Sequence, residues 1–88
     1  MKRLKTNPEL FAAYMEAVDN QLRDNNPPET RITFNRLQRE GFSEVDAKKL
    51  IGQAIASESF WIIKKNEAFN LKRFIKSLNR LPVPPEAS

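Results

Sequence analysis

The side chains best suited to bind a ligand are positively charged and lie near the C-terminal end of the chain. Four of them recur on one side of an expected helix: Lys72, Arg73, Lys76 and Arg80. A row of cations suits phosphate groups, so these residues form a candidate polyanion-binding surface. The alternative is a solvated basic face that keeps the protein in solution. Specific nucleic-acid recognition usually adds aromatic or polar readers, and the nearby Phe69 and Phe74 are expected in the core instead.

A single carboxylate is the second candidate. Glu58 is set within an apolar helix face, between Ala54 and Trp61. One interpretation is a buried functional carboxylate. The other is a structural carboxylate, paired with an arginine or with backbone, or lying at the rim of the face. A lone carboxylate without a second acid, base or metal does little catalysis, so the structural interpretation is favoured.

Most other chemistry is excluded by composition. The chain contains no cysteine, which removes disulfides, thiol nucleophiles and thiolate metal sites. It contains no histidine, which removes the commonest general base and the commonest metal ligand. There is also no glycine-rich phosphate loop and no paired-carboxylate motif. We therefore expect a protein that is not an enzyme and that holds no metal or cofactor.

Length and charge set the class of protein. The chain has 88 residues, of which 40% are hydrophobic and 30% charged, a balance typical of one globular domain. The net charge of +4 comes entirely from residues 60–88. No apolar run approaches the length of a membrane span. The basic start, residues 1–5, is not followed by the apolar segment of a signal peptide, so we expect a cytoplasmic protein.

The spacing of apolar residues predicts four helices, near residues 7–24, 27–40, 43–65 and 70–81. Each expected helix begins after a side chain that can cap it: Asn7 or Thr6, then Asn26, Ser43 and Asn70. Gly41 provides the left-handed residue that ends the second helix. We expect one helical domain over residues 7–81, a basic tail at 1–6 and a proline-rich tail at 82–88.

The third expected helix is apolar on two opposite faces. One face carries Ala47, Leu50, Ile51, Ala54, Trp61 and Ile62. The other carries Val45, Gly52, Ala56, Ser59, Phe60 and Ile63, and its two small residues would let a neighbouring backbone come close. Because a helix that is apolar all round is a buried one, we expect an all-α, irregular four-helix bundle around a central, largely buried third helix. Trp61 is expected to be buried in its core.

Several short matches also suggest a family. In chain order they are Asn7-Pro8, Gln21-Leu22, Pro27-Pro28, Arg36-Leu37, Ala47, Glu58 and Trp61. Over residues 7–80 they resemble the C-terminal helical half of a bacterial family known only as a domain of unknown function. The resemblance implies an all-helical fold and no particular activity. Members of that family carry histidines in the first and third helices beside a glutamate, an arrangement suited to metal or acid–base chemistry. Here Phe11 and Met15 stand at the first pair, and only Glu58 is left.

The hairpin around Gly41-Phe42-Ser43 is similar to those of ubiquitin-associated domains and of helix-turn-helix proteins. The third expected helix is too long for the former. In the latter, that helix would enter the major groove, but its first turn carries Glu44 and Asp46, which repel phosphate. Neither interpretation is favoured.

Two hypotheses of function remain. An apolar surplus, with Ile32, Phe60 and Ile63 pointing away from the main faces of their helices, favours a module that binds a protein partner or a second copy of itself. The alternative is a weak nucleic-acid or polyanion binder that uses the basic fourth helix. No membrane partner is expected.

Overall fold

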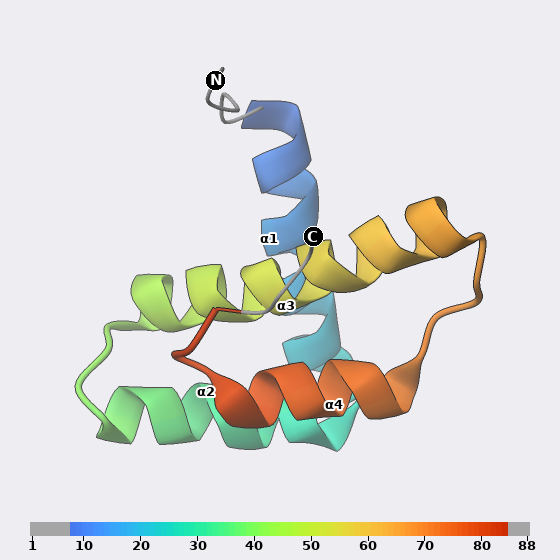
Figure 1. Ribbon diagram of the computed structural model, residues 1–88. Coiled ribbons are helices and arrows are strands. Elements are labelled where there is room, and N and C mark those ends of the chain that lie inside the picture. Colours follow the sequence, from blue (N-terminus) through green and yellow to red (C-terminus); the bar gives the residue numbers. More distant parts are fainter. Residues whose placement is uncertain (1–7, 85–88) are drawn as a thin grey trace.

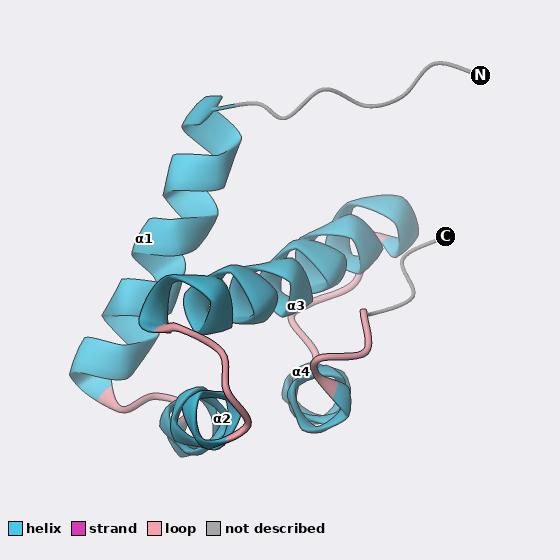
Figure 2. Cartoon of the chain, turned by 90° about the vertical axis from the view of Figure 1, so that its left-hand side faces the viewer, coloured by secondary structure: helices cyan, strands magenta, loops and turns pink. Residues whose placement is uncertain are grey.

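Four helices and no strand make up residues 8–84, the part of the chain that the computed structural model describes. They are α1 (Pro8–Asp24), α2 (Pro28–Arg39), α3 (Glu44–Lys65) and α4 (Leu71–Arg80). Beneath α3, α2 and α4 lie side by side, while α1 crosses α3 steeply (Figures 1 and 2). The expected all-α bundle is confirmed. The basic tail at 1–6, the cap at Asn7 and the last four residues lie outside the described range.

Two of the helix starts follow the expected caps. The Ser43 hydroxyl accepts a hydrogen bond from the Asp46 backbone N–H at 3.0 Å. The Asn70 side chain accepts one from the Arg73 backbone N–H at 2.9 Å. Gly41 has a φ of +107°, in the region that side-chain-bearing residues avoid. These local predictions are confirmed because each depends on only a few neighbouring residues.

The expected cap of α2 is wrong. Its N-cap is Pro27, and no side chain caps the helix. The helix begins at the second proline of the pair rather than the first, which leaves Asn26 one position too early. The backbone N–H of Asn26 instead donates to the Gln21 carbonyl at 3.1 Å, and so closes the end of α1.

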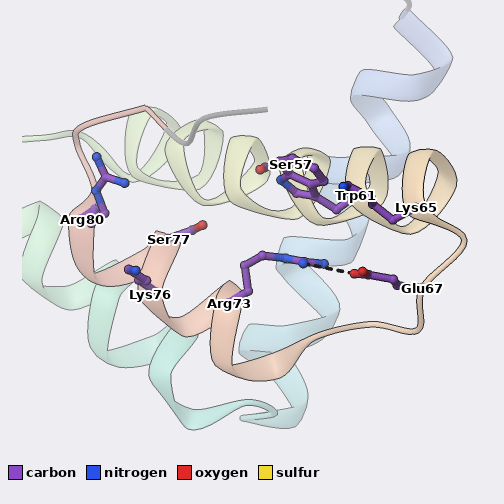
Figure 3. A pocket seen from close by; sticks show the side chains of 8 residues that line it. All are labelled: Ser57, Trp61, Lys65, Glu67, Arg73, Lys76, Ser77 and Arg80. Atoms are coloured by element: carbon purple, nitrogen blue, oxygen red, sulfur yellow. Dashed lines mark hydrogen bonds and ion pairs between the residues drawn. The ribbon is translucent and has the colours of Figure 1, made fainter. Parts of the chain in front are cut away.

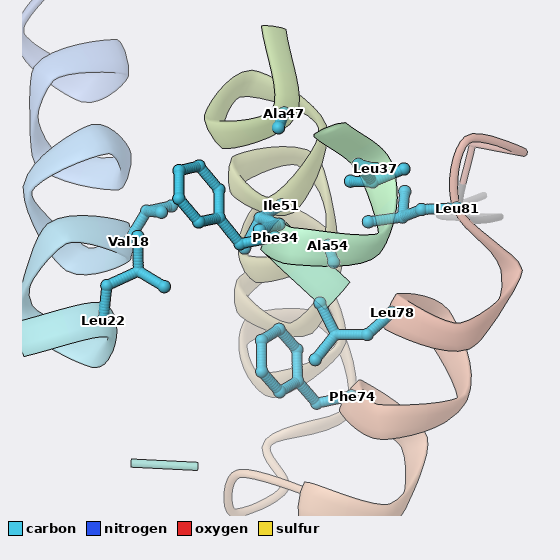
Figure 4. Close-up of a cluster of buried hydrophobic side chains, with 10 residues drawn as sticks. All are labelled: Val18, Leu22, Phe34, Leu37, Ala47, Ile51, Ala54, Phe74, Leu78 and Leu81. Carbon is cyan, nitrogen blue, oxygen red and sulfur yellow. The ribbon is translucent and has the colours of Figure 1, made fainter. Parts of the chain in front are cut away.

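The core lies where all four helices meet (Figure 4). Its buried apolar side chains are Val18, Leu22, Phe34, Leu37, Ala47, Ile51, Ala54, Phe74, Leu78 and Leu81. Hydrogen bonds and ion pairs also join the helices around the core. Arg36 on α2 donates to the Leu78 carbonyl at 3.0 Å, and Lys48 on α3 pairs with Asp19 on α1 at 2.9 Å. Phe69, expected in the core, is half exposed, although its ring centroid lies 5.7 Å from that of the buried Phe74.

The central helix is less buried than its composition suggests. It contacts each of the other three helices, as expected. However, Val45 is 58% exposed and Ile63 82% exposed, one near each end of α3. The steep crossing of α1 covers this face only near its middle, at Gly52, where α1 contributes side chains rather than a close backbone. Both ends of the face are left open.

The Gly52 position gives a first prediction. A Cβ built there would lie 3.8 Å from Met15 Sδ and 3.9 Å from the nearest atoms of Tyr14 and Val18, which is ordinary contact. Gly52→Ala should therefore stabilise the protein by about 0.5–1 kcal/mol, since glycine is a poor helix former. Gly41→Ala is the control and should destabilise it, because of the positive φ. Thermal unfolding checks both, and a destabilised Gly52→Ala variant would show that α1 and α3 lie closer together.

Candidate functional site

Glu58 is buried and forms an ion pair with Arg73 on α4. The Glu58 side chain is 2% exposed, whereas that of Arg73 is 29% exposed. The Arg73 guanidinium donates from Nε to Oε2 at 2.5 Å and from Nη2 to Oε1 at 3.2 Å. The Asn70 backbone N–H also donates to Oε1, at 3.2 Å. The carboxylate is thus occupied on both oxygens, which suits a structural brace between α3 and α4 better than a reacting group.

The same pair takes Arg73 out of the candidate basic surface. Its remaining nitrogen, Nη1, donates to Glu67 at 3.3 Å. The hydrogen bond to Glu58 raises the pKa of Arg73 above its usual value, with Glu67 adding to the effect and desolvation opposing it. Because the charged form is favoured in the fold, this stabilisation is present at all pH below the usual pKa and is lost only in strong alkali. Arg73 therefore stays charged but committed to two carboxylates.

The other basic residues of α4 separate into two groups. Lys76 and Arg80 line a hollow of about 390 Å³ between α3 and α4, whereas Lys72 is exposed and does not line it. We call this space the α3–α4 hollow (Figure 3). Lys65, at the end of α3, lines the hollow from the side opposite Lys76 and Arg80. The structure thus brings three of the four expected cations to one hollow: Arg73, which is already paired with carboxylates, Lys76 and Arg80. It adds Lys65, which the sequence interpretation missed.

Four further residues line the α3–α4 hollow. Ser57, Glu67 and Ser77 were missed as site residues, and Trp61 was expected in the core instead. A signal for part of this set was present, because Ser57, Trp61 and Lys65 recur every four residues along α3. The sequence alone does not show that this row on α3 faces Lys76 and Arg80 on α4, because that depends on how the two helices pack.

Trp61 is not the core residue that was expected. It is half-buried, lies outside the core cluster and forms part of the wall of the α3–α4 hollow. Its ring has the Arg73 guanidinium carbon 5.7 Å from its centroid and the Lys65 amine 5.6 Å from it. The reason is its position: α4 packs against the middle of α3, and Trp61 lies one turn beyond.

A second hollow is apolar and lies between α1 and α3. It has a volume of about 210 Å³ and is lined by Phe11, Tyr14, Met15, Lys49, Gly52, Gln53 and Ala56. We call it the α1–α3 groove. Phe11 and Met15 therefore meet on one surface, but Glu58 is not part of it and points toward α4 instead.

Other kinds of site find little support. Within residues 8–84 there is no group of three or more acidic, histidine or cysteine residues that could hold a metal ion. None of the helices in this range is both long and apolar enough to cross a bilayer. Comparison with known protein families, with characterised proteins and with solved structures finds no significant match.

Proposed function

We propose that the protein is a non-catalytic interaction module that self-associates through the α1–α3 groove. One observation carries the proposal: the N-terminal half of α1 is apolar yet lies outside the core. Only Val18 and Leu22 of this helix are buried, and Phe11 is 42% exposed. In Figures 1 and 2 this half of α1 projects beyond the other helices. A projecting apolar helix end is typical of a surface that another protein covers.

A second copy of the chain fits this surface on two grounds. First, each copy offers both a projecting apolar helix end and an apolar groove, so two copies related by a twofold axis can cover each other's surfaces. Second, the charges are complementary. Glu16 lies on α1, where Asp19 is already paired with Lys48, and Lys49 lies at the rim of the groove. Neither Lys49 nor Glu16 has an ion-pair partner within residues 8–84.

The polyanion alternative has less support in its original form. A continuous basic row along α4 is what a nucleic-acid backbone would need. Arg73 is committed to carboxylates, and Lys72 lies apart from the hollow that Lys76 and Arg80 share. We therefore favour self-association over a polyanion-binding surface made of all four residues.

Self-association is tested by measuring the molar mass with light scattering during size-exclusion chromatography, at low and at high salt. We expect a dimer at both salt concentrations, because an interface that is mainly apolar responds little to salt. Phe11→Asp should give a monomer, since it places a charge in the interface. Ile32→Asp is the matched control: Ile32 is 62% exposed on α2 and lies outside the groove, so this variant should remain dimeric.

Circular dichroism of the Phe11→Asp variant shows whether it is still folded, which separates a broken interface from a broken fold. A wild-type protein that stays monomeric at high concentration would refute self-association. A dimer that survives Phe11→Asp but is lost with Ile32→Asp would place the interface on α2 and refute the proposed surface.

A further inference from the structure

We propose that the α3–α4 hollow is a binding site for a small anion that carries two or more linked phosphate groups. The site is separate from the α1–α3 groove and does not depend on self-association. It shares Arg73, Lys76 and Arg80 with the basic row on α4, but it excludes Lys72 and includes residues of α3.

Unpaired positive charge is the first observation behind this assignment. Lys65, Lys76 and Arg80 all line the hollow, and none has an ion-pair partner within residues 8–84. The acidic residue of the lining, Glu67, is paired with Arg73 at 3.3 Å. The three cations without a partner therefore lie around the same hollow, Lys65 on α3 and Lys76 and Arg80 on α4 (Figure 3). Like charges held around a common hollow repel one another, so a multivalent anion between them is stabilised strongly.

Unused hydrogen-bond donors are the second observation. Ser57 on α3 and Ser77 on α4 line the hollow, and neither hydroxyl makes a hydrogen bond within residues 8–84. The indole N–H of Trp61 is likewise without an acceptor in this range. Hydroxyl and N–H donors set among cations are the groups that recognise phosphate oxygens. These donors distinguish the hollow from an ordinary solvated lysine surface.

The ion pair between Glu58 and Arg73 holds the two sides of the site at a fixed spacing. It joins α3 to α4 through Arg73, beside the hollow, and so fixes the distance between the helices that carry Ser57 and Ser77. A site held in place before binding loses less entropy when the ligand enters.

Size and shape favour a small ligand over a nucleic acid. The volume of about 390 Å³ lies within the range of small-molecule sites. A nucleic-acid backbone needs cations spaced along an open surface, whereas here they surround a single hollow. Linked phosphates carry enough negative charge to form ion pairs with Lys65, Lys76 and Arg80 at the same time. A single phosphate group carries less charge and reaches fewer of these cations.

The experiment uses the full chain and potassium pyrophosphate as the probe. Trp61 is the only tryptophan in the chain, so its fluorescence reports on this hollow alone. We expect saturable binding by calorimetry and a matching change in Trp61 emission, at ionic strength held constant with potassium chloride. The double variant Lys76→Gln with Arg80→Gln should bind about tenfold more weakly or worse. Lys72→Gln, which removes a charge from the same helix outside the hollow, should change affinity by less than about twofold.

Several results would overturn the proposal. One is the absence of saturable pyrophosphate binding at millimolar concentration. A second is an equal loss in Lys72→Gln and in the double variant, which would indicate net charge rather than a site. A third is that single-stranded or duplex nucleic acid binds more tightly than pyrophosphate does, and that Lys72→Gln weakens this binding. Weaker binding of inorganic phosphate than of pyrophosphate would support it. Repeating the titration with Phe11→Asp should leave the affinity unchanged.

Discussion

Replacing Glu58 by alanine should lower the free energy of unfolding by about 2–3 kcal/mol, a substantial part of the stability of a domain this small. The substitution removes both oxygens that hold Arg73 and the acceptor of the Asn70 N–H at the start of α4. It also leaves a cavity at a position that is 2% exposed. Urea unfolding followed by circular dichroism measures the effect.

An exposed ion pair provides the control. Arg36 on α2 and Glu40, the residue that caps the end of α2, lie 3.0 Å apart, and the Glu40 side chain is 42% exposed, so Glu40→Ala should cost less than about 1 kcal/mol. If Glu58→Ala cost no more than Glu40→Ala, the pair would not brace the fold. The double variant Glu58→Leu with Arg73→Met should recover most of the loss, because apolar side chains of similar volume can replace a buried pair.

The single variant Arg73→Met adds a second test. It leaves the Glu58 carboxylate buried without a cation, so it should destabilise the protein more than the double variant does. A single variant as stable as the double variant would show that water reaches the carboxylate once Arg73 is gone.

The features that the sequence could predict are those decided locally. Ser43 and Asn70 cap their helices because a cap needs only a hydroxyl or amide three residues from a free backbone N–H. The buried stripe of α4, with Phe74 and Leu78, follows from helical periodicity alone. The error at Asn26 is also local: two consecutive prolines offer two starting points, and the pattern does not distinguish them.

The features that the sequence could not predict depend on how helices cross. Val45 and Ile63 are apolar and were expected to be covered, but α1 meets α3 over a short length and leaves both exposed. The same holds for the site. Lys72 and Lys76 are equivalent in a helical pattern, and only the packing of α4 against α3 decides that Lys76 lines the hollow and Lys72 does not.

Phe74→Ala should cost about 3–5 kcal/mol and should lower Tm far more than Trp61→Ala, although tryptophan is the larger residue. Phe74 is fully buried in the core between α2, α3 and α4, so its removal leaves a cavity that the surrounding helices cannot close. Trp61 is only partly buried, in the wall of the α3–α4 hollow, and its loss should cost about 1–2 kcal/mol. Thermal unfolding of both variants compares them directly. A Trp61→Ala protein that melts below Phe74→Ala would mean that Trp61 belongs to the core after all, and that the hollow is closed by its ring.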